Sequence, residues 1–130
     1  MMQEFYTIDD YPIDVETTKT LFKEFIDNQN LGIAYLIYDG SKIVGYFILS
    51  FIFSFEYKGR LAFLDELYIH ESARGQGIGS ETVMFIKKIA PTFDIKMMYL
   101  EVENHNDAAK KLYSSEGFMF HNRKIMKHKF

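Results

Sequence analysis

The segment that is most informative about the architecture of this chain is Arg74-Gly75-Gln76-Gly77-Ile78-Gly79-Ser80. The segment follows an apolar run, Leu61 to Ile69, that is typical of a strand, and it leads into an amphipathic helical pattern. Its three glycines allow positive φ angles, so that several backbone N–H groups face an anion at the positive end of a helix. The segment therefore predicts a cradle for a diphosphate, with Arg74 adding a fixed positive charge at its mouth.

Two better-known glycine patterns do not fit this segment. A nucleoside-triphosphate loop has Lys followed by Ser or Thr after its last glycine, whereas Ser80 and Glu81 follow Gly79 here. A dinucleotide-binding fingerprint has the spacing G-x-G-x-x-G, whereas the spacing here is G-x-G-x-G. Neither an NTP nor NAD is therefore the expected ligand. Two interpretations remain open, an Arg-x-x-Gly-x-Gly anion site and a plain glycine turn before a helix.

The segments around the loop predict a strand, a helix and a second strand. Apolar residues recur at helical intervals from Ile78 to Ile89, and Pro91 prevents continuation of the helix. The second strand is expected over Lys96 to Val102. Because such crossovers are right-handed, the strands 61–69 and 96–102 should be parallel. The glycine loop would then lie at the carboxyl end of a parallel strand, where ligands bind in α/β sheets.

The N-terminal half predicts a helix followed by a hairpin. Residues 14–28 have helical apolar spacing, with their first residue, Asp14, as the N-cap. Strands are expected over 33–38 and 42–55, joined by a tight turn at Asp39-Gly40. Both alternating sets of side chains in 42–55 are largely apolar, so we expect this strand to be covered on both faces.

The C-terminal part predicts one more helix, over Asp107 to Ser115, with Asn106 as its N-cap and Gly117 in the C′ position. Two closing strands are expected, near 118–120 and 123–129. The predicted fold class is α/β, or mixed α+β. It has three layers, with helices on both faces of a central, mixed and mostly antiparallel sheet.

Composition narrows the classes of function. The chain has 130 residues, 48% of them hydrophobic, which predicts one compact domain over 1–130. It has no cysteine, which excludes a disulfide framework, a thiolate metal site and a cysteine nucleophile. The net charge of −3 argues against a nucleic-acid binder.

No metal, membrane or export function is expected either. The four histidines show no metal-site spacing, and no apolar run is long enough to span a bilayer. The first residues contain no basic region before an apolar stretch, so no signal peptide is visible. Together with the lack of cysteine, this makes the cytoplasm the expected location.

A second motif lies downstream of the loop. It consists of Leu100-Glu101-Val102 followed by Asn106-x-x-Ala109-x-x-Leu112-Tyr113-x-x-x-Gly117-Phe118. Asn106, Ala109 and Tyr113 share one face of the predicted helix, where the small Ala109 leaves room for a ligand. With the loop and the preceding Asp65-Glu66-Leu67-Tyr68-Ile69, this motif makes residues 33–130 resemble the GNAT family of acetyl-coenzyme A dependent N-acetyltransferases.

The resemblance implies how coenzyme A would bind. The parallel strands would splay apart, and pantetheine would enter the gap and form sheet-like hydrogen bonds with the first strand. The loop backbone would hold the pyrophosphate. The cofactor-binding residues implied in this way are Leu67, Tyr68, Ile69, Arg74, Gly75, Gln76, Gly77, Ile78, Gly79, Ser80, Asn106, Ala109 and Tyr113.

The resemblance also implies direct attack of a neutral amine on the thioester. Tyr113 would be the general acid that protonates the departing thiolate, and a backbone N–H near Tyr68 or Ile69 would stabilise the oxyanion. For the base, Glu66 is the first choice among the residues. Glu101, Glu103 and a water chain leading to one of these carboxylates remain alternatives.

The amine acceptor is less defined. Phe55, Glu56 and Tyr57, at the end of a strand, are the candidate acceptor-binding residues, and the carboxylate suggests a cationic amine. Family members commonly begin with a strand and two helices, whereas residues 1–32 offer one clear helix. A family habit of pairing through terminal strands suggests a homodimer. Two other functions stay open, a non-catalytic acyl-coenzyme A binding module that regulates a partner and a plain interaction domain.

Overall fold

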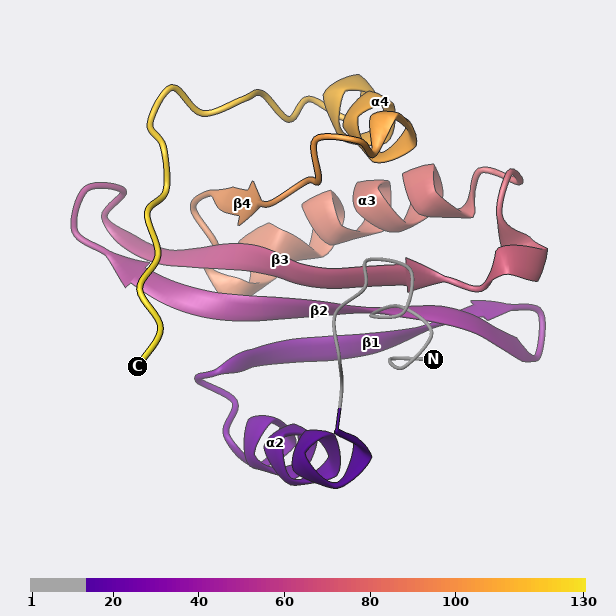
Figure 1. Cartoon of the computed structure of the whole chain (residues 1–130), viewed down its shortest axis with the longest axis horizontal. Coiled ribbons are helices and arrows are strands. Elements are labelled where there is room, and N and C mark those ends of the chain that lie inside the picture. Colours follow the sequence, from indigo (N-terminus) through magenta and orange to yellow (C-terminus); the bar gives the residue numbers. More distant parts are fainter. Residues whose placement is uncertain (1–13) are drawn as a thin grey trace.

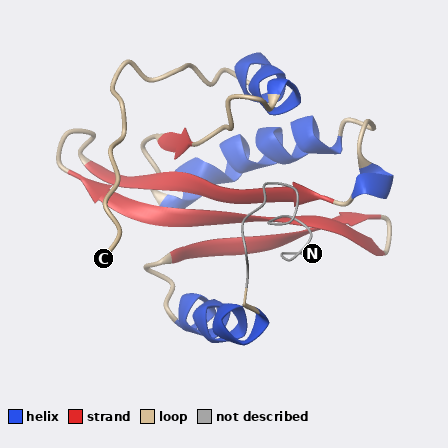
Figure 2. Cartoon of the chain, in the orientation of Figure 1, coloured by secondary structure: helices blue, strands red, loops and turns tan. Residues whose placement is uncertain are grey.

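The protein is seen here in a computed structural model that describes residues 14–130. Within these residues, a four-stranded sheet of the order β1-β2-β3-β4 lies among three α-helices (Figures 1 and 2). The elements along the chain are α2 Val15–Asp27, β1 Gly32–Asp39, β2 Lys42–Ser54, β3 Gly59–Ile69, the 3₁₀ helix η1 Glu71–Ala73, α3 Ile78–Ile89, the 3₁₀ helix η2 Ala90–Phe93, β4 Met98–Leu100 and α4 Asp107–Ser115. The mixed α+β class is therefore confirmed. Expectations for residues 1–13, including the lack of a signal peptide, lie outside the described residues.

The predicted N-terminal helix and hairpin are both present. Asp14 caps α2, and its Oδ1 accepts a hydrogen bond from the Glu16 N–H at 3.3 Å. β1 and β2 pair antiparallel, and Gly40 takes a φ of 63° in the turn between them. Because that φ lies in the left-handed region, the turn favours glycine at this position.

The parallel pair of strands is confirmed, although it is shorter than predicted. β2 and β3 pair antiparallel, and β4 then lies parallel to β3 in the pairs Ala62–Met98, Phe63–Tyr99 and Leu64–Leu100. The Lys96 N–H donates to the Arg60 carbonyl at 2.8 Å, so hydrogen bonding begins where the strand was expected. It ends at Leu100, and the chain then turns away toward α4 (Figure 1).

A β-bulge marks the point at which β3 and β4 separate. Ile48 pairs with Glu66 and Leu49 with Leu64, so that Asp65 is the extra residue on β3. A bulge bends its strand and increases the local twist. The bulge directly follows the last parallel pair, Leu64–Leu100, and β3 continues without a parallel partner strand to Ile69.

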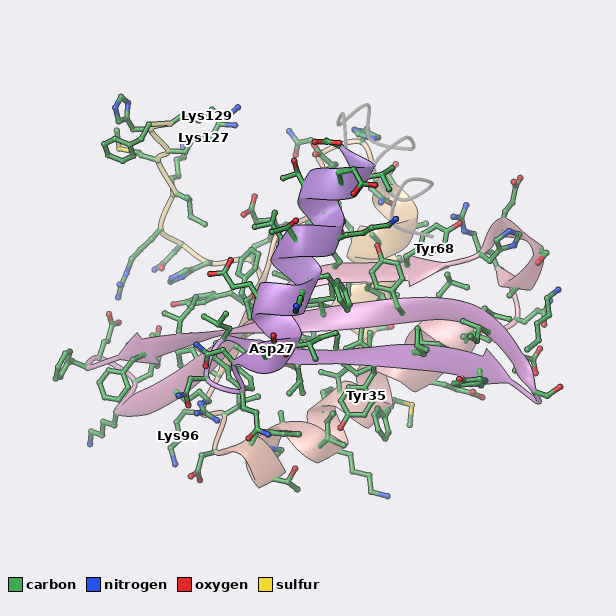
Figure 3. All side chains as sticks on the ribbon, turned by 90° about the horizontal axis from the view of Figure 1, so that it is seen from below. Asp27, Tyr35, Tyr68, Lys96, Lys127 and Lys129 are labelled. Atoms are coloured by element: carbon green, nitrogen blue, oxygen red, sulfur yellow. The ribbon has the colours of Figure 1, made fainter. Side chains whose placement is uncertain are left out.

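Two apolar clusters hold helices on opposite faces of the sheet. One cluster packs Phe47, Leu49 and Leu64 against Ile86 of α3. The other packs Tyr46, Ile48 and Tyr68 against two phenylalanines of α2, Phe22 and Phe25. Figure 3 shows α2 and α3 on the two sides of the sheet. The three-layer arrangement follows from this alternation of apolar side chains along β2 and β3.

The prediction that β2 is covered along its whole length is wrong. Residues 44–49 are buried, but Ile52, Phe53 and Phe55 are 45%, 70% and 90% exposed. On the α3 face the reason is length, because a strand of 13 residues spans roughly 43 Å, whereas the 12 residues of α3 span about 18 Å. On the other face, α2 crosses the strands instead of running along them (Figure 3). The helices therefore cover only part of β2.

The two predicted closing strands are absent. No residue of 118–130 belongs to a strand, and residues 119–130 are exposed. This C-terminal tail leaves α4 and crosses near the β2–β3 turn, and Lys127 and Lys129 stand away from the sheet (Figures 1 and 3). Because β4 is only three residues long, it offers a very short edge for another strand.

Candidate functional site

The glycine loop has the backbone conformation that its sequence predicts. Gly75 and Gly77 have φ angles of 77° and 81°. A Cβ on either residue would meet nothing within 4 Å, so conformation, not space, requires glycine here. Gly77 is the N-cap of α3, and the first helical hydrogen bond runs from the Glu81 N–H to its carbonyl at 3.0 Å. The N–H groups of residues 78–80 thus lie at the positive end of the helix.

Arg74 is held at the end of β3. Its Nε donates to the Ile69 carbonyl at 2.8 Å, and its guanidinium carbon lies 5.7 Å from the centre of the Tyr68 ring. The guanidinium thus lies where β3 meets the loop, next to the α3 N-terminus. This arrangement suits an anionic ligand that follows the strand and then bends over the loop.

The short helix η1 fixes the entry to the loop. His70 caps it, because the Ser72 N–H donates to His70 Nδ1 at 3.2 Å, which places the neutral ring's proton on Nε2. The His70 N–H donates to the Val44 carbonyl at 2.6 Å and so ties the end of β3 to β2. Gln76 Nε2 lies 3.4 Å from the Ser72 carbonyl.

The three sequence motifs meet at Gly79. A Cβ on Gly79 would lie 3.3 Å from Leu112 Cδ2 on α4 and 3.6 Å from Ile69 Cδ1 on β3. The loop, the end of β3 and α4 are therefore in close contact, although α4 lies far downstream of the other two in the sequence. The structure in this way brings the predicted pyrophosphate and pantetheine segments to one place.

Helix α4 begins and ends as its sequence predicts. Asn106 Oδ1 accepts from the Ala109 N–H at 3.0 Å and caps the helix. Gly117 follows the C-cap with a φ of 92°. Since the cap uses only the oxygen of the Asn106 amide, the Nδ2 group is a separate donor.

Tyr113, the predicted general acid, lies on α4 and is partly buried. Its ring packs against the core on the α3 face and makes an edge contact with Phe118, with ring centres 5.7 Å apart. Burial raises the pKa of Tyr113 to about 12. The phenol therefore keeps its proton at neutral pH, as a general acid must.

Glu66, the predicted base, is a buried carboxyl group with 5% exposure on the α2 face of β3. The Tyr46 hydroxyl lies 3.4 Å from its Oε1 as a hydrogen-bond donor. Tyr46 also lines a groove of about 1130 Å³ between α2 and β1. Among the alternatives for the base, Glu101 is exposed and Glu103 is partly buried.

The predicted acceptor residues lie at the β2–β3 turn. Phe55 is 90% exposed, while Tyr57 is partly buried with its ring edge toward Tyr99. Glu56 forms a bidentate ion pair with Arg123, with distances of 2.7 and 3.1 Å. The guanidinium lowers the pKa of the Glu56 carboxyl.

Sequence reasoning missed three residues at this turn. Tyr99 is hydrogen-bonded to Tyr57 and stacks on His121, with ring centres 5.5 Å apart. The sequence places Arg123 in a predicted closing strand, near 123–129, and gives it no role at a site. The charge complementarity of Glu56 and Arg123 was the available signal, but a separation of 67 residues gave no reason to pair them.

Within residues 14–130, no group of three or more His, Cys, Asp or Glu side chains is placed to hold a metal ion. The same residues contain no helix that is both long and apolar enough to cross a membrane.

The described geometry defines an α+β protein in which a glycine loop and a helix N-terminus follow the strand of a parallel pair that continues beyond its partner. A sequence model of the Acetyltransferase (GNAT) family matches residues 1–118. The chain therefore belongs to the Acetyltransferase (GNAT) family.

Individual relatives agree with this assignment. A thialysine N-epsilon-acetyltransferase of Bos taurus is 33% identical over 78 residues, which is 60% of this chain and 45% of that protein. The match thus spans less than half of the relative. An integron cassette protein from the mobile metagenome of Cole Harbour Salt Marsh has a TM-score of 0.87 at 26% identity, over 98% of this chain and 79% of its own.

The fold is also shared with more distant proteins. The structure of AAC(6')-Iy in complex with a bisubstrate analog, CoA-S-monomethyl-acetylneamine, has a TM-score of 0.83 at 12% identity. The similarity covers the whole of this chain and 87% of that one. At this identity the likeness concerns the fold alone.

Proposed function

We propose that this chain is an N-acetyltransferase that moves the acetyl group of acetyl-coenzyme A to a primary amine by direct attack. The observation that carries the proposal is the contact of the glycine loop, the end of β3 and α4 around Gly79. Family membership supports the same chemistry. The proposal treats residues 1–130 as one N-acetyltransferase domain.

The donor would lie along β3 and over the loop. Leu67, Tyr68 and Ile69 would offer strand backbone to the pantetheine where β3 has no parallel partner strand. The pyrophosphate would bind the N–H groups of Gln76–Ser80, with Arg74 beside it. The open space at Gly75 and Gly77 fits this role, because nothing lies within 4 Å of the position that a Cβ would take on either residue.

The second motif would complete the donor site. Asn106 would offer its Nδ2 group, and Ala109 would leave space beside α4. Tyr113 would donate its phenolic proton to the sulfur as the bond between the acetyl carbon and sulfur breaks, which releases coenzyme A as a thiol. With a pKa of about 12, the phenol carries that proton throughout the neutral range.

The amine must lose a proton before or during attack. An alkylamine has a pKa of about 10.4, so the neutral form costs about 4.6 kcal/mol at pH 7. Glu66 would accept this proton, directly or through water, and the Tyr46 hydroxyl would orient its carboxylate. The backbone N–H of Tyr68 or Ile69 would stabilise the oxyanion.

The acceptor would be a cationic amine that enters near Phe55, Glu56 and Tyr57. The carboxylate of Glu56 supplies the negative charge for such a substrate. The Bos taurus relative is named for thialysine, an amine of this class, which favours small aliphatic amines as the first compounds to test.

A binding experiment tests the donor half of the proposal. Acetyl-coenzyme A at 100 times its dissociation constant should add about 2.7 kcal/mol of stability. Absence of a thermal shift and of calorimetric binding would leave only the plain interaction domain.

A kinetic experiment tests the catalytic half. The Tyr113→Phe variant should keep coenzyme A affinity and lose most turnover, measured as thiol release with a panel of polyamines, amino acids, aminoglycosides and peptides. Binding without turnover of any amine by the unmodified protein would favour the non-catalytic acyl-coenzyme A module. An unchanged rate in Tyr113→Phe would remove Tyr113 as the acid.

We also propose that two copies associate through their C-terminal tails. Large apolar side chains of the tail are exposed, and they are Met119, Phe120, Ile125, Met126 and Phe130. Exposed apolar groups in such number are costly in water and are typical of an interaction surface.

A further inference from the structure

Side chains from three distant segments meet at the β2–β3 turn. Glu56 and Tyr57 come from the turn, Tyr99 from β4, and His121 and Arg123 from the tail. Arg123 binds Glu56, Tyr57 bonds to Tyr99, and His121 stacks on the Tyr99 ring at an interplanar angle of 24°. We refer to these five residues as the turn cluster.

The turn cluster borders the place where β3 and β4 separate. Tyr99 pairs with Phe63, one residue before the last parallel pair, Leu64–Leu100. Leu64 belongs to the core on the α3 face, so alternation places Phe63 and Tyr99 on the opposite, α2 face. Buried Glu66 is on the α2 face too, because the bulge at Asp65 interrupts the alternation, and its carboxyl group lies beside the Tyr46 hydroxyl.

The Glu56 carboxylate already holds a cationic group. The Arg123 guanidinium binds it through two nitrogens, close enough to Tyr57 and Tyr99 to interact electrostatically with both. A carboxylate flanked by aromatic rings is also a suitable site for an ammonium group. The Arg123 guanidinium therefore occupies, within the same chain, the position at Glu56 that the ammonium group of a ligand could take.

This ion pair is weak enough to be exchanged. The side chains of Arg123 and Glu56 are 64% and 51% exposed, and exposed pairs of this kind contribute little to stability. The tail beyond Arg123 is fully exposed. A dissolved cation can therefore compete with Arg123 for Glu56 without unfolding any part of the sheet.

We propose that Glu56, with Tyr57 and Tyr99, is a subsite for the second cationic group of a diamine acceptor, and that Arg123 is a tethered competitor for it. The diamine would displace Arg123 and lift His121 from Tyr99. Its first amine would then react at the separation of β3 and β4. The proposal rests on the proposed acetyltransferase function and deepens it by naming the acceptor class.

The kinetic test compares alkyl diamines with alkyl monoamines of the same chain length. Removal of the competitor in Arg123→Ala should lower the KM for diamines about two- to fivefold, with kcat unchanged. It should leave the KM for monoamines as it is. Glu56→Gln should raise the KM for diamines more than the KM for monoamines of the same chain length. A raised diamine KM in Arg123→Ala would overturn the proposal, because Arg123 would then help to bind the acceptor.

Lys124→Ala is the matched control, because Lys124 is the neighbouring exposed cation of the tail. It should leave both KM values unchanged. An equal fall in KM for Lys124→Ala and Arg123→Ala would point to the general charge of the tail and contradict a specific competitor.

A spectroscopic test separates this proposal from the acetyltransferase function. Without acetyl-coenzyme A, a diamine should shift the His121 ring signals in proton NMR, because stacking on Tyr99 would be lost. His105, which is exposed in another loop, is the reference. Unmoved His121 signals while the enzyme acetylates diamines would overturn the subsite and leave the function intact. Shifted signals without any acetylation would support the subsite and contradict the function.

Discussion

Gly75 and Gly77 have left-handed φ angles with open space where a side chain would be. Gly45 and Gly32 differ, because a Cβ there would lie 2.1 Å from the Tyr68 carbonyl oxygen and 2.0 Å from that of Leu49. Glycine is thus required for conformation in the loop and for space in the sheet. Substitution of a loop glycine by alanine tests the conformational requirement.

Gly77→Ala should weaken acetyl-coenzyme A binding about tenfold, because strain of roughly 1–2 kcal/mol falls on the conformation that exposes the loop N–H groups. Isothermal titration calorimetry measures this loss. Gly40→Ala is the matched control, since Gly40 also has a left-handed φ and open space but lies in the β1–β2 turn. Both variants should lose similar stability. Equal affinity in the two variants would separate the loop from donor binding.

Tyr113 should make stability depend on alkaline pH. The folded protein holds the phenolic proton up to about pH 12, whereas the unfolded chain loses it near pH 10.0. The contribution is therefore fully present below pH 10 and is lost as pH rises toward 12, by up to about 3 kcal/mol. Urea unfolding should show this extra alkaline loss in the unmodified protein and not in Tyr113→Phe. A parallel loss in both would contradict the raised pKa.

At the scale of elements, α4 combines a structural and a proposed functional role in one residue. Asn106 Oδ1 caps the helix through the Ala109 N–H, while its Nδ2 is the group proposed to bind coenzyme A. The two roles use different atoms of one amide. They can therefore be separated by substitution.

Asn106→Asp should keep the cap and the stability, because aspartate is an equally good N-cap, but it should lose the amide donor and bind coenzyme A more weakly. Asn106→Ala should lose about 1 kcal/mol of stability as well. Chemical unfolding and calorimetry measure the two quantities. Unchanged coenzyme A affinity in Asn106→Asp would limit Asn106 to the cap.

The sequence predicted those elements that carry their own local signals. Asp14 and Asn106 mark helix starts, Gly117 marks a helix end, and Gly40 marks the hairpin turn. The glycine loop was predicted for the same reason. The prediction of two closing strands was wrong, because a strand at 118–129 needs a neighbouring strand to pair with. The neighbour would be β4, which is only three residues long, and the apolar run from which β4 was predicted does not reveal how short it is.

The candidate site was predictable as far as its motifs extend. Loop, strand end and α4 were each identified, but their contact at Gly79 depends on packing that no spacing rule gives. The Glu56–Arg123 pair was missed for the same reason. The exposure of Phe53 and Phe55 was not predicted. A run of alternating apolar residues indicates a strand, but it does not tell how much of that strand a helix covers.

At the scale of the whole molecule, the C-terminal tail, residues 119–130, is exposed and forms neither helix nor strand. Arg123 ties its first part to the β2–β3 turn, while Lys127 and Lys129 stand away from the sheet (Figure 3). The tail thus leaves apolar side chains available for another copy of the chain.

Deletion of residues 124–130 should shift a dimer to a monomer in sedimentation experiments, because it removes Ile125, Met126 and Phe130. Burial of each such side chain contributes about 1.5–3 kcal/mol to association. Replacing Lys127 and Lys129 with alanine is the control that keeps the apolar groups. A monomer at all concentrations of the full chain would contradict the tail-mediated dimer, and a dimer that survives the deletion would place the interface elsewhere.

The contact of Gly79 with Leu112 and Ile69 bears on the order of events in a catalytic cycle. Leu112 directly precedes Tyr113, so a donor seated in the loop would also settle the helix that carries the proposed acid. We therefore expect acetyl-coenzyme A to bind before the amine and coenzyme A to leave after the acetylated product.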